Sequence, residues 1–438
     1  MHRATRRTGV VLAALALPLL SATCGSSSST APSAPNTTVA VVAGNFQPGL
    51  VGYAVNVPPS VKVTGAGSAP VANATVTFTV QSGGGSVTGG TALTNSAGLA
   101  QVGGWTLGGS AGVNTLRATA TGTGIVSTPV TFTDTAVAAN QYTIQIQYFG
   151  PTPSATVQAA MNAAVAKWET LIYRPIGPIP IAVLADSCGP GTPAVNTTVN
   201  NLLILAKFDS IDGPGKILGQ AGPCEVRNSS GLTAVGVMEF DTADVAALIS
   251  SGSLNLVMLH EMGHVIGFGT LWNFLGNHCL QLPSNPPGTV LDTYFNCPKA
   301  TAAFNLLGGT SYTGSTLSPP GGNKVPVENC GASTLSLESS VGCGASTVNG
   351  HWREPVFHKE LMTGYLDAGA NPLSLVTVAA QEDLGYTVNY AAADPYVQIF
   401  AAPPAAGRAA PVFLGNDIRR GPIYVVDQAG RVVSVRRP

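Results

Sequence analysis

The spacing of apolar residues divides the chain into two regions with different periods. Between residues 39 and 137, apolar and polar residues alternate with a period of two, for example over 75–80 and 116–120, and glycine-rich turns separate these runs. Short alternating strands at this spacing predict an all-β sandwich. The preceding residues 24–38 are rich in serine, threonine, proline and alanine, which predicts a disordered linker.

A helical period appears in the second region, residues 140–392. A strand over 144–148 is followed by Ser154, a candidate N-cap, and by apolar residues on one face of a helix: Val157, Ala160, Met161, Ala164, Val165, Trp168 and Leu171. Further strands are expected at 179–184, 202–208 and 235–240, before a helix that Ser253 begins and Gly267 ends. We expect an α+β domain with a sheet above this last helix. The tail 393–438 has a strand-like run but no assignable role.

The helix after Ser253 carries His260-Glu261-Met262-Gly263-His264. Histidines four residues apart lie on one helical face, so both imidazoles reach one Zn²⁺, with the glutamate beside them as a general base. A catalytic zinc needs a third protein ligand. The compact form of this motif places that ligand at position 270, which is threonine here. The candidates are therefore His278, Asp292, His351 and His358.

Two of these candidates have simpler interpretations. His278 stands in a segment rich in proline and asparagine and is typical of a loop, and Asp292 is typical of a helix N-cap. His351 instead opens the run Gly-His-Trp-Arg-Glu, and Glu-Leu-Met-Thr-Gly follows at 360–364.

Together with the pentad and Gly267, these two motifs resemble leishmanolysin, a metzincin zinc peptidase whose third histidine is displaced by an insertion. A looser likeness covers residues 140–392. The resemblance implies that His260, His264 and His351 bind zinc, that Glu261 is the base and that Met362 lies in the turn beneath the metal. Tyr365 is a candidate to stabilise the oxyanion, as a tyrosine near this turn does in some metzincins. The alternative for Tyr365 is a buried residue with a satisfied hydroxyl.

The function expected from these motifs is a zinc endopeptidase. A zinc-bound water, deprotonated by Glu261, attacks the carbonyl of a protein or peptide substrate. The alternatives are a non-catalytic surface protein for adhesion or carbohydrate binding, and an amidase that acts on cell-wall peptides. Runs at 70–78, 94–100 and 111–120 resemble bacterial Ig-like domains of the invasin type, which implies a stalk or adhesion module.

Composition and the N-terminus predict the location. Charged residues make up 9% of the 438 residues and the net charge is −1, so nucleic acid is not an expected partner. Residues 1–23 combine arginines with a short apolar run, which predicts an export signal. Cys24 then stands where a bacterial lipoprotein is acylated. We expect membrane contact only through this anchor, at the cell surface or outer membrane. Ordinary cleavage near Ala22 would instead give a secreted protein.

The other cysteines all fall within the protease-like region. An even number in an exported protein predicts disulfides, and pairing of sequence neighbours gives 188–224, 279–297 and 330–343. The residues concerned are Cys188, Cys224, Cys279, Cys297, Cys330 and Cys343.

Overall fold

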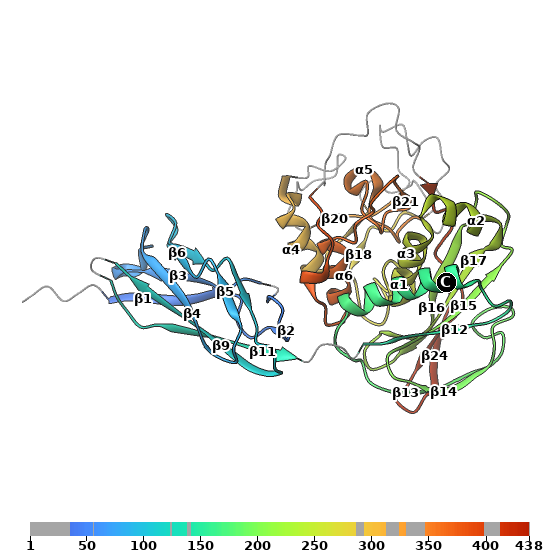
Figure 1. Cartoon of the computed structure of the whole chain (residues 1–438), viewed down its shortest axis with the longest axis horizontal. Helices are drawn as coiled ribbons and strands as arrows, with labels where there is room; N and C mark the ends of the chain where they lie inside the picture. The colour runs from blue at the N-terminus through green and yellow to red at the C-terminus, as the bar shows by residue number, and fades with distance from the viewer. Residues whose placement is uncertain are drawn as a thin grey trace, which may run out of the picture.

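The computed structural model describes residues 36–55, 57–122, 125–137, 142–285, 293–311, 324–329, 347–397 and 412–437. They form two domains, each with its own hydrophobic core (Figure 1). The fold class is the predicted one: an all-β Ig-like sandwich followed by an α+β domain. The predicted signal and Cys24 lie outside the described residues. No helix among the described residues has the length and apolar character needed to cross a bilayer.

Two sheets make up the N-terminal sandwich. Their strand orders are β10-β1-β3-β7 and β2-β11-β9-β4-β6, and β5 pairs with β8. Trp105 and Phe132 are fully buried in the core between them. The strands are β1 (Asn36–Ala43), β2 (Pro48–Leu50), β3 (Ser60–Thr64), β4 (Thr75–Ser82), β5 (Ser86–Thr88), β6 (Thr91–Leu93), β7 (Leu99–Gln101), β8 (Gly104–Thr106), β9 (Gly112–Thr121), β10 (Val126–Ser127) and β11 (Val130–Val137).

The start of the sandwich corrects the predicted linker. Strand β1 begins at Asn36, and its first residues pair with β10, so the predicted linker over 24–38 extends too far. Threonine-rich segments have high β propensity as well as the composition of linkers, and pairing with neighbouring strands decides between the two.

A six-stranded sheet is the frame of the second domain. Its order is β12-β15-β17-β16-β23-β24, and helices α1 (Ala155–Leu171) and α3 (Leu254–Ile266) pack against one face. The hairpin β13–β14 covers the other face around the Cys188–Cys224 disulfide. The strands are β12 (Ile144–Tyr148), β13 (Ile179–Val183), β14 (Val195–Val199), β15 (Leu202–Asp209), β16 (Gly219–Arg227), β17 (Thr233–Asp241), β23 (Ile423–Val426) and β24 (Val432–Arg436).

This sheet also changes the interpretation of the tail 393–438. Strand β23 pairs parallel with β16, and β24 pairs antiparallel with β23, so the end of the chain completes the sheet of the second domain. The sequence analysis assigned no role to this tail, and the structure shows that it supplies two strands of the sheet.

Local signals explain the two long helices. Ser154 Oγ accepts the Val157 N–H of α1 at 3.4 Å, as an N-cap does. Ser253 occupies the N-cap position of α3 but makes no side-chain capping bond. Helix α3 ends at Gly267, whose φ of 137° suits glycine and turns the chain away from the sheet.

Shorter elements complete this domain. The remaining helices are α2 (Thr242–Ser251), α4 (Pro298–Leu306), α5 (Glu354–Phe357) and α6 (Leu375–Leu384), with 3₁₀ turns at Ala66–Ser68, Gly309–Ser311 and Tyr390–Ala392. Strands β18 (Leu280–Gln281), β19 (Tyr294–Phe295) and β20 (Val325–Pro326) form one small sheet, and β21 (Tyr365–Leu366) pairs with β22 (Val412–Phe413).

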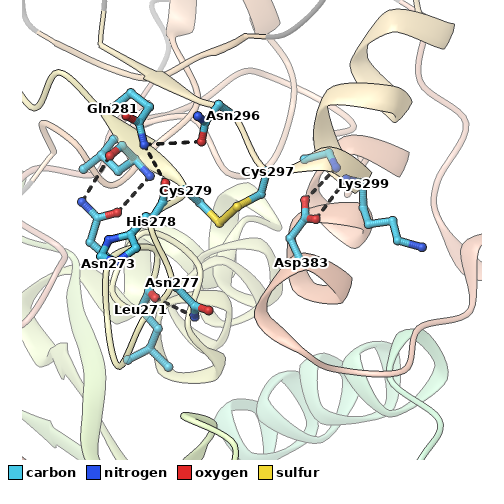
Figure 2. Close-up of a disulfide and its surroundings, with 12 residues drawn as sticks. Leu271, Asn273, Asn277, His278, Cys279, Gln281, Asn296, Cys297, Lys299 and Asp383 are labelled. Carbon is cyan, nitrogen blue, oxygen red and sulfur yellow. Dashed lines mark hydrogen bonds between the residues drawn. A yellow bond between two sulfur atoms is a disulfide. The ribbon is translucent and has the colours of Figure 1, made fainter.

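Two of the three predicted disulfides are present. Cys188 bonds to Cys224, and Cys279 bonds to Cys297 beside the start of α4 (Figure 2). Cys330 and Cys343 lie outside the described residues, so their pairing stays a prediction.

Candidate metal centre

Three histidine side chains converge in the core of the second domain. The Nε2 atoms are 3.0 Å apart for His260 and His264, 3.2 Å for His260 and His351, and 3.0 Å for His264 and His351. All three side chains are fully buried. Two come from one face of α3, and the third comes from the segment that follows the long insertion.

The other candidates for the third ligand lie elsewhere or are not described. His278 lies in the loop beside Cys279, where its carbonyl accepts a hydrogen bond from Gln281 (Figure 2). His358 ends helix α5 with a positive φ of 48°. Asp292 lies outside the described residues. Neither described alternative belongs to the buried group of potential metal ligands.

Backbone carbonyls orient each ring of this cluster. The Nδ1 of His260 lies 2.7 Å from Leu361 O, that of His264 lies 2.9 Å from Phe268 O, and that of His351 lies 2.9 Å from Thr347 O. A carbonyl only accepts hydrogen bonds, so each Nδ1 carries the proton and each Nε2 of a neutral ring presents a lone pair. Three lone pairs that face one another in a buried space repel one another, and a cation bound between them would remove this repulsion.

Glu261 lies beside this cluster without a hydrogen-bond partner. Both of its carboxylate oxygens are buried and unpaired among the described residues. Burial raises the pKa of Glu261 well above its usual range, and the nearby charge of Asp417 adds to this. Its Cγ lies 3.2 Å from the point where a Cβ on Gly219 would stand, so β16 passes directly along the glutamate.

The turn at Met362 packs beneath the helix. Met362 is fully buried, and its Sδ and Cε lie 3.0 and 2.8 Å from the position that a Cβ on Gly263 would take. A side chain at position 263 would therefore collide with this methionine, which explains the glycine at that position of the motif.

Buried Glu360 holds that turn in place. Its carboxylate accepts the Met362 N–H at 2.6 Å, the Ser374 N–H at 2.9 Å and the Thr377 hydroxyl at 2.5 Å. The Thr377 hydroxyl also accepts the indole N–H of Trp352, next to His351, at 2.8 Å. The turn, the start of α6 and the third histidine are thus one hydrogen-bonded unit.

Tyr365 follows the turn in β21. Its side chain is 5% exposed, and its ring centroid lies 5.1 Å from that of Phe413 in β22. The part of Tyr365 as an oxyanion donor stays a prediction.

A fourth group in the cluster was missed by sequence analysis. Asp417 Oδ2 lies 2.9 Å from His351 Nε2, 3.2 Å from His260 Nε2 and 3.8 Å from His264 Nε2, and the residue is fully buried. Asp417 comes from the tail and belongs to no motif, so no local signal in the sequence could have found it.

The environment of the cluster favours an ionised Asp417 and neutral rings at His260 and His264, whereas it stabilises the protonated form of His351. Burial lowers the pKa of His260 and of His264. Burial also opposes a charge on His351, but the neighbouring Asp417 carboxylate raises the pKa of that ring above its usual value. Burial likewise opposes ionisation of Asp417, and the surrounding histidines nevertheless hold its pKa well below the usual range.

The donor set fits zinc. The potential ligand atoms of His260, His264, His351 and Asp417 all lie within 4.8 Å of one another. Imidazole nitrogens with a carboxylate oxygen are donors that Zn²⁺ takes in tetrahedral sites, and carbonyl partners on the far ring nitrogens are usual for such ligands. The fold and the cluster therefore define a buried metal centre on a helix that also carries a glutamate.

Comparison with known families agrees with this centre. The family model of the leishmanolysin peptidases (Peptidase_M8) matches residues 192–399, which include the three histidines, Glu261 and Met362. The predicted resemblance is confirmed for residues 192–399, which match the model of the leishmanolysin metallopeptidases. The match begins later than the predicted likeness at residue 140, and it ends before Asp417.

Other comparisons concern known structures and curated proteins. The chain is similar to the D00-D0 domain of Intimin (19% identity, TM-score 0.15, 22% of this chain and 45% of that chain). It is also similar to the D0-D1 domain of Intimin (20% identity, TM-score 0.16, 25% of this chain and 56% of that chain). It therefore spans about half the length of these solved chains, and the sandwich assignment rests on its own strand order and core. A comparison with curated proteins finds no match.

Proposed function

We propose that this protein is a zinc-dependent endopeptidase with Glu261 as its general base. One observation carries the proposal: three buried imidazoles present their Nε2 lone pairs to one point, and a buried carboxylate without a partner lies beside them. An unpaired buried carboxylate costs free energy, about 1–3 kcal/mol or more, so a purely structural or adhesive domain would gain nothing from it. Perturbed titratable groups of this kind are typical of catalytic sites.

Each residue has a distinct part in the proposed reaction. Bound zinc supplies a Lewis acid that polarises a carbonyl and lowers the pKa of a water to about 7. Glu261 takes up the water proton on its carboxylate and later delivers it to the leaving amine. Burial raises the pKa of Glu261, which makes its carboxylate a stronger base than that of a solvent-exposed glutamate and so favours uptake of the water proton. The ion would be held by His260, His264 and His351. Glu360 fixes the turn by accepting the Met362 N–H, and the Met362 side chain packs against α3.

The test is a comparison of Glu261→Gln with wild type. We expect the variant to bind one zinc per chain and to keep its fold, but to cleave casein or a quenched peptide at least about 10²-fold more slowly. Since Gln is nearly the size of Glu, a change in packing would not explain the loss. His260→Ala should lose both metal and cleavage. Normal cleavage by Glu261→Gln would remove this residue from the mechanism.

We also propose that the protein is exported and tethered to the membrane through Cys24. The arginine-rich and then apolar residues 1–23 support export, and the serine-rich composition after Cys24 is typical of the segment that follows such an anchor. The disulfides of the second domain support an oxidising compartment. The sandwich would then hold the protease away from the bilayer.

A further inference from the structure

We infer that Asp417 and the backbone around it form an internal inhibitor, in which the Asp417 carboxylate is a fourth protein ligand of the metal and occupies the place of the attacking water. This inference rests on the proposed peptidase function. Residues 416–419 belong to the C-terminal segment, beyond the part of the chain that matches leishmanolysin.

The carboxylate lies against the metal-binding atoms. Asp417 Oδ2 contacts His351 Nε2 at 2.9 Å and His260 Nε2 at 3.2 Å, in the same buried space into which the three Nε2 lone pairs point. Its other oxygen, Oδ1, is buried and has no hydrogen-bond partner among the described residues. A carboxylate aimed at three imidazole lone pairs is placed to coordinate the ion that they hold.

The backbone on either side of Asp417 pairs with β16 in the part of that strand that lies next to Glu261. The Ala221 N–H donates to Asp417 O at 2.8 Å, and the Arg419 N–H donates back to Ala221 O at 2.9 Å. Ala221 thus forms a parallel bridge with Ile418. An extended peptide that adds to a sheet edge is a common mode of peptide recognition. The segment therefore occupies the edge along which a substrate peptide would reach Glu261.

Contacts at the start of this segment fix its position. The Leu414 N–H donates to Gly364 O at 3.1 Å, just after the Met362 turn, and the Thr347 hydroxyl donates to Gly415 O at 2.5 Å. Thr347 is also the residue whose carbonyl orients His351. Strand β23 then joins the sheet after Asp417. The segment spans the metal centre and is attached on both sides by elements that hold the ligands.

The chemistry of zinc separates two interpretations of this arrangement. A catalytic zinc keeps one position open for water, whereas four protein ligands close the site, as in structural zinc sites. A structural site has no use for Glu261, whose two unpaired oxygens are buried beside the cluster. A closed site that retains its base fits an enzyme in a latent state, so activity requires that Asp417 leave the metal.

The test uses the full chain with Co²⁺ in place of zinc, which reports ligand changes in its visible spectrum, and acetohydroxamate as a small probe of an open position. Asp417→Asn and Asp417→Ala are compared with wild type. The matched control is Asp427→Asn, which lies on the same segment but pairs with Arg431, away from the cluster. Peptide cleavage is measured on the zinc forms of the same proteins.

In both Asp417 variants, we expect an altered Co²⁺ spectrum, metal affinity that falls at least about 10-fold, and tighter acetohydroxamate binding. Peptide cleavage should rise about 10–100-fold, which corresponds to an open state that wild type populates at about 1–10%. The Asp427→Asn protein should match wild type.

Two results would overturn the inference. An unchanged spectrum and unchanged acetohydroxamate affinity in Asp417→Asn would show that the carboxylate is no ligand. Asp417 variants that fold but bind no metal would indicate that Asp417 is a permanent ligand of a structural site. Variants that open to acetohydroxamate but cleave no peptide would support Asp417 as the blocking ligand and contradict the peptidase proposal, which separates the two failures.

Discussion

Glu225 is a buried carboxyl group that forms no ion pair among the described residues. It lies in β16 at 3% exposure, and its Oε2 has no hydrogen-bond partner among the described residues. Burial raises its pKa from 4.5 to about 7. The folded state therefore binds a proton more tightly than the unfolded state, so the free energy of unfolding falls as pH rises between these two values.

Replacing Glu225 with Gln should remove this pH dependence. The amide stays neutral, so we expect a gain of about 1–3 kcal/mol in the free energy of unfolding at pH 8 and little change at pH 4.5. Urea unfolding of the variant and wild type at both pH values measures this. Equal effects at the two pH values would mean that packing, and not the charge, accounts for the difference.

The metal-binding residues differ in how far the sequence predicts them. His260 and His264 follow from helix geometry alone, because four residues place them on one face. His351 needed the resemblance to leishmanolysin, since spacing left several candidates open. Asp417 was not predictable, because a single aspartate in a tail carries no periodic or motif signal and reaches the cluster through long-range contacts of its segment, including those with β16.

Helices and strands were likewise predictable only where the signal lies within their own sequence. Helices α1 and α3 were predicted together with the Ser154 cap and the end of α3 at Gly267, because apolar spacing and these residues are encoded within each segment; Ser253 holds the N-cap position of α3 without a side-chain bond. Strand β16 was missed. Its sequence, Gly-Gln-Ala-Gly-Pro-Cys-Glu-Val-Arg, has few β-branched residues and contains proline, and it forms a strand because β17 and β23 pair with it.

The Cys279–Cys297 disulfide links the loop after α3 to the start of α4. Next to it, the Asp383 carboxylate of α6 accepts the N–H groups of Lys299 at 2.9 Å and Ala300 at 2.8 Å (Figure 2). The two connections together tie α4 to α3 and α6, the elements that surround the metal centre.

Removing this disulfide should destabilise the second domain without removing metal ligands. For the 18-residue separation, we expect Cys279→Ala with Cys297→Ala to lower the free energy of unfolding by about 3 kcal/mol, through the larger entropy of the unfolded chain. Denaturant unfolding measures the loss, and zinc stoichiometry is the control. The Cys188–Cys224 disulfide closes a longer loop, so its removal by Cys188→Ala with Cys224→Ala should lower the free energy of unfolding slightly more. A loss of zinc in the first variant would indicate that the Cys279–Cys297 disulfide is also needed to position the metal ligands.

At the scale of the whole molecule, the two domains have separate cores. The sandwich core draws only on residues 39–136, and the cores of the second domain draw only on residues from Tyr142 onward. We therefore expect residues 142–438 alone to fold, bind one zinc and cleave peptide within about 2–3-fold of the full chain. Circular dichroism, metal analysis and the peptide assay check this. Failure to bind zinc would show that the sandwich contributes to the fold of the second domain.

The location of the whole molecule depends on the chemistry of Cys24. If Cys24 is acylated, the mature protein begins at this residue and partitions into detergent. Each buried CH₂ contributes about 0.8 kcal/mol, so two or more acyl chains give a stable anchor where one does not. By resemblance to lipoproteins of two-membrane bacteria, Gly25 after the cysteine favours the outer membrane.

Mass spectrometry of the mature N-terminus distinguishes the two possible products. We expect a peptide that begins at Cys24 and carries the mass of its acyl chains, and a Cys24→Ser protein that appears in the soluble fraction with unchanged peptidase activity. Cys24 precedes the residues of both hydrophobic cores in the sequence, so a lower activity per molecule would not follow from loss of the anchor alone. A free amino group on an unmodified residue near Ala22, in a soluble secreted product, would rule out acylation and leave the sandwich as a spacer without a membrane attachment.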